Sequence, residues 1–308
     1  IAKLCSEFRQ IMSANGYNEV ILWSFTDSNL ASNFTKINEE LFLTKPISSE
    51  LNYMRPSLLV NLLKVTQKNL SRSINSISLY EIGRVFNNTN HEESTTHISA
   101  IRAGDYAERN SYYPSRSFDV FDVKADLNAI LKSLNINIDH CFLSDQTPTY
   151  YHPARSSKIK IGQKEIGYFG QIHPTICSKL SINKNIFAFE ININNLPVKK
   201  NSFGKKKAFI SSLFPSVKRD FAFIIDKNIP ITNILNKIKK IDKDQIKNVS
   251  LFDIYTDNKI PNHKQSIAVA VEIQNKQKTL SEDEINLICN KITDDISNSF
   301  KAEIRDGV

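Results

Sequence analysis

The sequence of 308 residues lacks several features that mark common protein classes. It has no apolar run near the roughly 18 residues that a membrane-spanning helix needs. Its four cysteines lie far apart, without a Cys-x-x-Cys pair or the Cys/His spacing of a zinc site. Neither a P-loop nor a Gly-x-Gly-x-x-Gly motif occurs. We therefore expect reduced thiols, no metal site, no membrane partner and a cytoplasmic location.

The positive charge of the chain is concentrated in one short segment. The net charge is +8, and residues 199–207 hold five lysines and no acidic residue. Together with the neighbouring Pro, Gly and Ser, these lysines predict a basic linker over residues 201–212, between domains at 1–200 and 213–308. The lysines fit a solvated connector and a phosphate-contacting strip equally well. The excess favours an anionic partner such as RNA.

The second predicted domain has a legible order of elements. Residues 219–226 alternate as a half-buried strand does, and Pro230 begins an amphipathic helix that runs to Ile241. Strands are predicted at 249–255 and 266–274, and Ser281 with Glu284 forms a capping box that begins a second helix. A last strand is expected at 302–305. The order β-α-β-β-α-β is that of a ferredoxin-like fold, in which two helices cover one face of a four-stranded antiparallel sheet.

The first two hundred residues predict a mixed arrangement of helices and strands. Helices are expected over residues 1–15, with Gly16 as the C-cap, and over 57–70 and 123–134. Extended segments are expected at 19–25, 77–86, 97–103, 157–161, 165–170 and 187–193. The economical interpretation is one antiparallel sheet flanked by helices, so the whole chain belongs to the α+β class.

Nine segments together resemble the C-terminal part of the β subunit of bacterial phenylalanyl-tRNA synthetase. The resemblance is collinear, covers essentially the whole chain, and is specific in combination although each segment alone would be weak. The segments are MRPSLLVNLL (54–63), LYEIGRVF (79–86), FDVFDVKAD (118–126), YHPARS (151–156), GYFGQIHP (167–174), FPSVKRDFAF (214–223), LFDIY (251–255), KQSIAVAVEIQ (264–274) and TLSEDEIN (279–286).

The resemblance implies an inactive, antiparallel class II synthetase-like domain followed by a ferredoxin-fold anticodon-binding domain. Residues 1–25 would correspond to the subunit-interface motif of class II enzymes, and residues 79–103 to the strand-loop-strand that holds ATP in active relatives. The implied partners are a catalytic α subunit, in an α2β2 heterotetramer, and tRNA(Phe), with no DNA. The family's N-terminal modules, including an editing domain, have no counterpart in these residues. Ala154 stands where the family usually has glycine.

The residues themselves argue against catalysis by this chain. Amino-acid activation needs cations that stabilise the charge developing on a triphosphate, beside a glycine that permits close approach. The segment where the last such motif would lie, FAFEININNL at 187–196, has neither Arg nor Gly. We expect Glu190 to be a structural or interface carboxylate, and Arg84 alone cannot clamp a triphosphate. His152 and His173 are expected to be satisfied polar residues at strand ends. We predict no catalytic residue, metal ligand or cofactor in this chain, with ATP and Mg²⁺ used by the holoenzyme.

Candidate RNA contacts are sought in the second domain, because RNA-binding domains stack unpaired bases on aromatic side chains and contact phosphates with cations. Phe221 and Phe223 share a strand parity and are expected in the core. The residue set that we predict to bind tRNA is Phe214, Lys218, Arg219, Tyr255 and Lys264, with Lys278 and Arg305 as further cations of the domain.

Two other functions stay open at this point. A single-chain catalytic synthetase of the organellar kind also ends in this type of domain, and the missing Arg and Gly count against it. A free-standing RNA-binding or scaffold protein is the other alternative. Association with a catalytic α subunit would separate it from a synthetase subunit.

Overall fold

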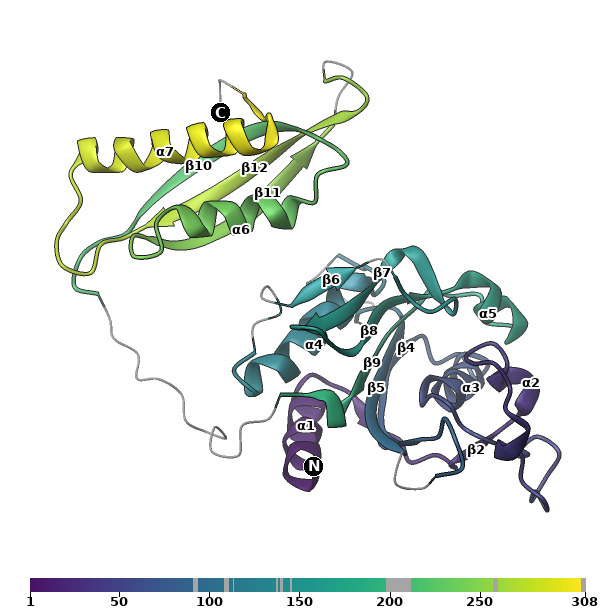
Figure 1. Ribbon diagram of the computed structural model, residues 1–308. Helices are drawn as coiled ribbons and strands as arrows, with labels where there is room; N and C mark the ends of the chain where they lie inside the picture. Colours follow the sequence, from purple (N-terminus) through teal and green to yellow (C-terminus); the bar gives the residue numbers. More distant parts are fainter. Residues whose placement is uncertain are drawn as a thin grey trace. The chain divides into compact units, whose positions relative to one another are not determined.

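The protein is described by a computed structural model that covers residues 1–90, 94–107, 111–112, 114–136, 138, 141–144, 146–197, 212–256 and 260–305. It divides into two compact units, Ile1–Lys206 and Lys207–Val308 (Figure 1). The predicted linker lies outside the described residues apart from Ser212.

A seven-stranded sheet forms the centre of the first unit, with strand order β1-β4-β5-β9-β8-β7-β6. Only the β1–β4 pair among these described strands is parallel, and the other neighbours are antiparallel. A separate pair is formed by β2 and β3. The strands are β1 (Asn18–Glu19), β2 (Phe25–Thr26), β3 (Tyr53–Met54), β4 (Ser76–Val85), β5 (Thr95–Gly104), β6 (Phe142–Ser144), β7 (Tyr151–Ile161), β8 (Lys164–Ile172) and β9 (Ile186–Asn192).

Helices cover both faces of this sheet. One hydrophobic cluster joins α1 and α4 to one face, and a second joins α3 and α5 to the other. Because both faces are covered, β9 carries a nearly continuous apolar run in which all residues before Asn192 are buried. The helices are α1 (Ala2–Ala14), α2 (Ser28–Ala31), α3 (Leu59–Leu70), α4 (Val120–Ser133) and α5 (Pro174–Lys179), with short 3-10 turns η1 (Glu39–Leu41) and η4 (Ile193–Asn195).

The predicted elements of the first unit are present, with local differences. The expected extended segment at 19–25 is divided between β1 and β2. Helix α4 begins three residues earlier than predicted, because the carboxylate of Asp119 accepts hydrogen bonds from the backbone amides of Phe121 and Asp122 and completes a capping box. Helices α2 and α5 were not predicted, since they are too short to show a helical period.

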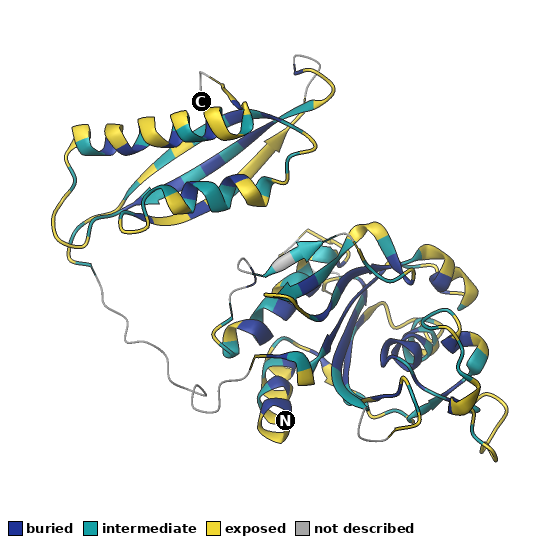
Figure 2. Ribbon diagram, viewed as in Figure 1, coloured by how far each residue is buried: buried dark blue, intermediate teal, exposed yellow. Residues whose placement is uncertain are grey.

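The second unit confirms the predicted ferredoxin-like order. Its sheet has the order β11-β12-β10-β13 and is antiparallel throughout its described pairs. Helix α7 starts at the predicted capping box of Ser281 and Glu284. Figure 2 shows its buried and exposed residues alternating along the helix. The elements are β10 (Val217–Asp226), α6 (Ile231–Ile241), β11 (Ile246–Tyr255), β12 (Lys264–Ile273), α7 (Glu282–Phe300) and β13 (Glu303–Ile304).

The α+β fold class is therefore confirmed. In the part of the chain that the structure describes, no helix combines the length and apolarity needed to cross a membrane.

Candidate functional site

Both helices of the second unit pack against the same face of its sheet (Figure 1). The side chains that alternate towards the helices are apolar and buried, as Phe223 in β10 and Ile267 in β12 show. The opposite face is built mainly from small and polar side chains, with Ile224 as a larger apolar member. Its centre is the pair Ala222 and Ala268, which lie opposite each other in the register of β10 and β12. The fold thus leaves one shallow face open for a ligand.

A β-bulge directs Tyr255 onto this open face. The register of β11 against β12 shifts between Leu251 and Asp253, and Phe252 is the extra residue. After the bulge, Asp253 lies opposite Ala268. Tyr255 lies opposite Ser266. Directly opposite residues in an antiparallel pair point to the same side, so the bulge moves both side chains to the open face.

Arg305 reaches the same place from the other edge of the sheet. Its backbone amide donates to the carbonyl of Ala222 over 3.0 Å. Its guanidinium carbon lies 5.0 Å from the centre of the Tyr255 ring. This is a cation–π contact. Tyr255 is in register with Ser266 and Ile224, whereas Arg305 bonds Ala222, which is in register with Ala268. The sequence pointed to Tyr255 and Arg305 singly, but only the structure pairs them.

The other predicted RNA contacts are spread over the unit. The ammonium of Lys264, near Tyr255 in the register, forms an ion pair with Glu303. Lys218 is exposed at the opposite end of β10, where it pairs in register with Glu272. Phe214 is half-buried, and its carbonyl accepts a hydrogen bond from Gln274 Nε2 over 2.6 Å. The structure therefore brings Tyr255 and Lys264 together and places Phe214 and Lys218 elsewhere.

Arg219 lies on the side of the sheet that the helices cover. It shares a strand parity with Phe221 and with the buried Phe223. Its positive charge acts on the Cys289 thiol of α7, where it opposes the effect of burial, which raises the pKa of that thiol. Its Nη1 donates to the neighbouring Lys218 carbonyl over 3.2 Å. RNA contact by the five predicted residues stays a prediction.

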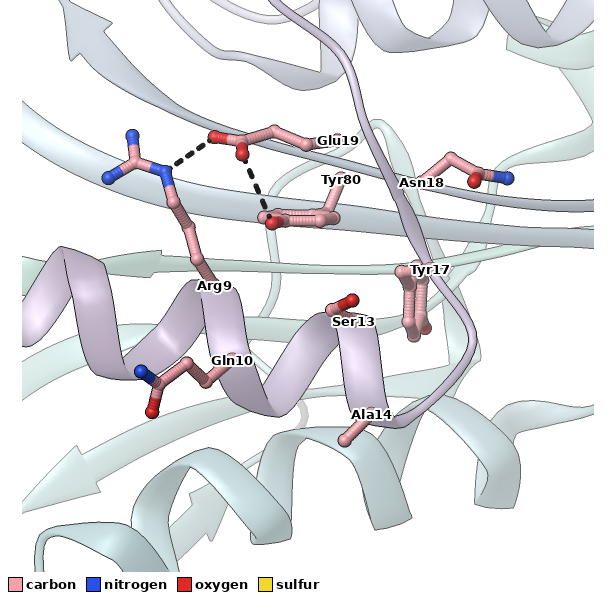
Figure 3. Close-up of a pocket in the computed structure, with 8 residues that line it drawn as sticks. All are labelled: Arg9, Gln10, Ser13, Ala14, Tyr17, Asn18, Glu19 and Tyr80. Carbon is pink, nitrogen blue, oxygen red and sulfur yellow. Dashed lines mark hydrogen bonds and ion pairs between the residues drawn. The ribbon is translucent and has the colours of Figure 1, made fainter.

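The first unit presents a polar hollow beside α1 and β1 (Figure 3). Arg9 Nε donates to Glu19 Oε1 over 2.8 Å, and the Tyr80 hydroxyl donates to Glu19 Oε2 over 3.3 Å. Burial, reinforced by the negative charge of Glu19, raises the pKa of Tyr80 to about 12. The hollow has a volume of about 750 Å³. The hollow offers hydrogen-bonding groups beside β1, which is an edge strand of the sheet.

Two large apolar side chains follow β1 directly. Ile21 is 91% exposed, and Trp23, the single tryptophan of the chain, is 62% exposed. Their side chains alternate with the half-buried Leu22. Exposed apolar groups of this size beside a sheet edge are typical of an interaction surface.

The interior cations near the predicted ATP strand are engaged within the protein. Arg55 Nη1 lies 2.7 Å from Glu81 Oε1, and both side chains are 3% exposed. Arg55 Nε also donates to the carbonyl of Arg84 over 2.9 Å. A Cβ atom on Gly83 would lie 2.4 Å from Arg55 Nη2, so glycine at this position gives the guanidinium its space. Arg55 is therefore paired within the protein and is not available to a triphosphate.

Both units of the chain match known protein families. Residues 1–193 match the family model described as the phenylalanyl tRNA synthetase beta chain CLM domain. The chain belongs to this family. Residues 212–305 match the model of the ferredoxin-fold anticodon binding domain. The resemblance drawn from the nine sequence segments is thereby confirmed.

The chain is similar to proteins of several bacteria that are named phenylalanine–tRNA ligase beta subunit. The chain is 41% identical over 305 residues to the phenylalanine–tRNA ligase beta subunit of Rickettsia bellii, with 99% of this chain and 35% of the relative covered. It is 35% identical over 303 residues to the beta subunit of Ehrlichia ruminantium, with 98% of this chain and 38% of the relative covered. The chain thus spans little more than a third of the length of these relatives.

Among solved structures, a pyrrolysyl-tRNA synthetase of Desulfitobacterium hafniense is similar with a TM-score of 0.47 and 14% sequence identity. The similarity covers 63% of this chain and 64% of that protein.

Proposed function

We propose that this chain is a non-catalytic part of phenylalanine–tRNA ligase. Residues 1 to about 200 support the catalytic α subunit, in an α2β2 heterotetramer, and the second unit binds the anticodon region of tRNA(Phe) during aminoacylation in the cytoplasm. The observation that carries the RNA-binding role is the tyrosine ring held by an arginine on the open sheet face. Family membership supports the synthetase context.

The open face has the chemistry that unpaired bases require. An anticodon loop presents splayed bases, which stack on aromatic rings and on guanidinium planes. Tyr255 and Arg305 provide one of each, and the short side chains of Ala222 and Ala268 lie next to them on the same face. The exposed carboxylate of Asp253 faces the same side and can accept hydrogen bonds from the amino group of a base. Lys218, exposed at the far end of β10, would supply a phosphate contact on this face, and Arg219, on the helix-covered side, would contact a phosphate outside it.

The apolar edge after β1 suits a protein partner. Ile21 and Trp23 would be covered by the α subunit, while Arg9 and Glu19 in the adjacent hollow would add polar contacts. Apolar anchors surrounded by polar groups are the usual anatomy of a stable interface.

Phenylalanine, ATP and Mg²⁺ belong to the α subunit in this proposal. The segment 187–196 contains no Arg or Gly, and Arg55 is neutralised by Glu81. The full chain without its partner is therefore proposed not to form an aminoacyl adenylate. Titration with tRNA(Phe), with and without the α subunit, tests the whole proposal and separates it from a free-standing RNA-binding role.

Replacing Tyr255 with alanine is expected to weaken the binding of tRNA(Phe) by about 1–3 kcal/mol, because one base loses its stacking partner. Electrophoretic titration of the full chain measures this change. Phe121→Ala removes an aromatic side chain that is 70% exposed in the first unit, and it should leave the affinity unchanged. Equal affinities of the Tyr255→Ala protein and the parent chain would remove the open face from the RNA-binding surface.

Replacing Ile21 with lysine is expected to weaken association with the α subunit at least about tenfold, because a charge would enter an apolar contact. Since Trp23 is the single tryptophan, 5-fluorotryptophan incorporated into this chain reports on it alone. Its fluorine resonance should shift when the α subunit binds. Ile47→Lys, at an apolar side chain that is 71% exposed elsewhere in the unit, is the matched control. Binding with an unshifted resonance would place the interface elsewhere.

A further inference from the structure

The first unit contains a second cavity, distinct from the hollow at α1 and β1. It has a volume of about 250 Å³. Its walls include Glu190 of β9, Tyr168 and Glu165 of β8, and Tyr150, with Pro56 and Ile166 as apolar surface. An apolar cavity of about 150 Å³ is known to hold benzene, so this one has room for an aromatic ring with a short polar group.

Glu190 gives the cavity a buried negative charge. The residue is 5% exposed. Its Oε1 lies 2.7 Å from His97 Nδ1, and its Oε2 accepts a hydrogen bond from the Ser57 hydroxyl. The Thr95 hydroxyl lies 3.0 Å from His97 Nε2. Ser57 and His97 are its side-chain partners, and no Lys or Arg among the described residues forms an ion pair with it.

Tyr150 adds a polar group without a partner. The residue is 8% exposed and lines the cavity. Among the described residues, no side-chain or backbone group forms a hydrogen bond with its hydroxyl. Burial, followed by the negative charge of Glu190, raises the pKa of Tyr150 well above its usual value, so the hydroxyl stays protonated. The Tyr150 side chain lines the cavity, where a ligand or water can satisfy its hydroxyl.

The remaining charges do not suit an anion. Lys158 Nζ forms an ion pair with Glu165 Oε2 over 3.3 Å. The Tyr168 hydroxyl donates a hydrogen bond to Glu165 Oε1. No Lys or Arg lines the cavity in the described part of the chain. A phosphate or carboxylate would meet the Glu190 carboxylate there, whereas a cation would meet Glu190 and the aromatic rings of Tyr150 and Tyr168, since Lys158 already pairs with Glu165.

We propose that this cavity binds a small organic cation, a primary ammonium or an amidinium group carried on a compact apolar body. The cation lies beside Glu190 and bonds the Tyr150 hydroxyl oxygen, and the apolar body packs on Pro56 and Ile166. A bound cation places an opposite charge beside the buried Glu190 carboxylate, which offsets part of the cost of keeping that charge out of water. The site is independent of the RNA-binding and docking roles above, since it shares no residue with either surface.

Titration of the full chain with three isosteric probes tests this site. Benzylamine carries the cation, benzyl alcohol is its neutral counterpart, and benzoate is the anion. By calorimetry at neutral pH, benzylamine should bind at least about tenfold more tightly than benzyl alcohol, and benzoate should not bind, because a charged hydrogen bond exceeds a neutral one by about that factor. Saturation-transfer NMR should show the aromatic protons of benzylamine in contact with the protein.

Two variants connect the binding to this cavity. Glu190→Gln keeps the shape of the side chain, removes its charge and should weaken benzylamine binding about tenfold. Tyr150→Phe removes the hydroxyl and should weaken it several-fold, and this second variant decides if Glu190→Gln fails to fold. Glu50→Gln changes an exposed carboxylate of the same unit and should have no effect. Equal affinity for benzylamine and benzyl alcohol, no benzylamine binding, or unchanged binding in the cavity variants would overturn the proposal.

Discussion

Replacing Asp126 with alanine is expected to lower the free energy of unfolding of the first unit by about 3–5 kcal/mol, because it leaves the buried cation of Arg102 without its counter-charge. Asp126 accepts hydrogen bonds from Arg102 Nε over 2.8 Å and from Arg102 Nη2 over 2.9 Å. It also accepts one from the Tyr17 hydroxyl over 2.7 Å. Two donors of the largely buried Arg102 and the buried hydroxyl of Tyr17 would lose their acceptor together.

The effect is expected to reach beyond α4, which carries Asp126. Arg102 belongs to β5, and its Nη2 also donates to the carbonyl of Asn15 at the end of α1. Its Nη1 donates to the Ser78 hydroxyl of β4. The guanidinium also lies 4.2 Å from the centre of the Tyr17 ring. This one side chain therefore joins two helices to two strands, so its displacement loosens the α1 and α4 side of the sheet.

Urea denaturation followed by the fluorescence of Trp23 measures this loss, because the single tryptophan lies in the first unit. Asp126→Asn keeps the shape of the side chain and should recover part of the stability. Glu50→Ala, at an exposed carboxylate, should change the unfolding free energy by less than about 0.5 kcal/mol. A loss below about 1 kcal/mol in Asp126→Ala would show that Arg102 reaches solvent or another acceptor.

Replacing Arg55 with methionine is expected to cost a similar amount, about 3–5 kcal/mol at neutral pH, because the Glu81 carboxylate would stay buried without a cation. In the intact protein, burial raises the pKa of Glu81, while the charge of Arg55 and its hydrogen bond lower it. Without Arg55, the pKa of Glu81 should rise further. The van der Waals space beside Gly83 would also be only partly refilled.

The sign of the pH dependence follows from the raised pKa. A folded carboxylate whose pKa lies above that of the unfolded chain, about 4.3, binds its proton more tightly in the folded state. Its contribution to stability is present below about pH 4.3 and is lost as the pH rises through the raised folded value. The deficit of Arg55→Met relative to the parent chain should therefore be larger at neutral pH than in mild acid.

Denaturation curves across this pH range measure the deficit. Adding Glu81→Gln to Arg55→Met removes the isolated charge and should recover stability and flatten the pH dependence. A deficit that is independent of pH would mean that lost packing, and not the uncompensated carboxylate, causes the destabilisation.

Several elements could be predicted from the sequence because their patterns are local. The apolar spacing of α3 and the capping box of α7 depend on residues within a few positions of each other. The same local alternation assigned Phe223 to the core correctly. The same alternation also places Arg219 on the core side of β10, as in the structure, whereas Arg219 was expected to contact RNA.

The open sheet face could be predicted only in part. Alternation along β11 would group Ser250 with Phe252 and Ile254 on one face, and the bulge at Phe252 instead groups Ser250 with Asp253 and Tyr255. A bulge is a property of two paired strands, so one strand's pattern cannot reveal it.

The sequence by itself determined the family, the α+β class and the ferredoxin-like order of the second unit, because collinear motifs and local periodicity carry that information. Only the tertiary structure decided that Arg305 covers Tyr255, that Arg55 is neutralised by Glu81, and that Glu190 lies beside Tyr150 in a small cavity. Each of these contacts joins residues at least 26 positions apart. Such pairs depend on strand order, register and packing, which emerge only when the whole sheet has formed.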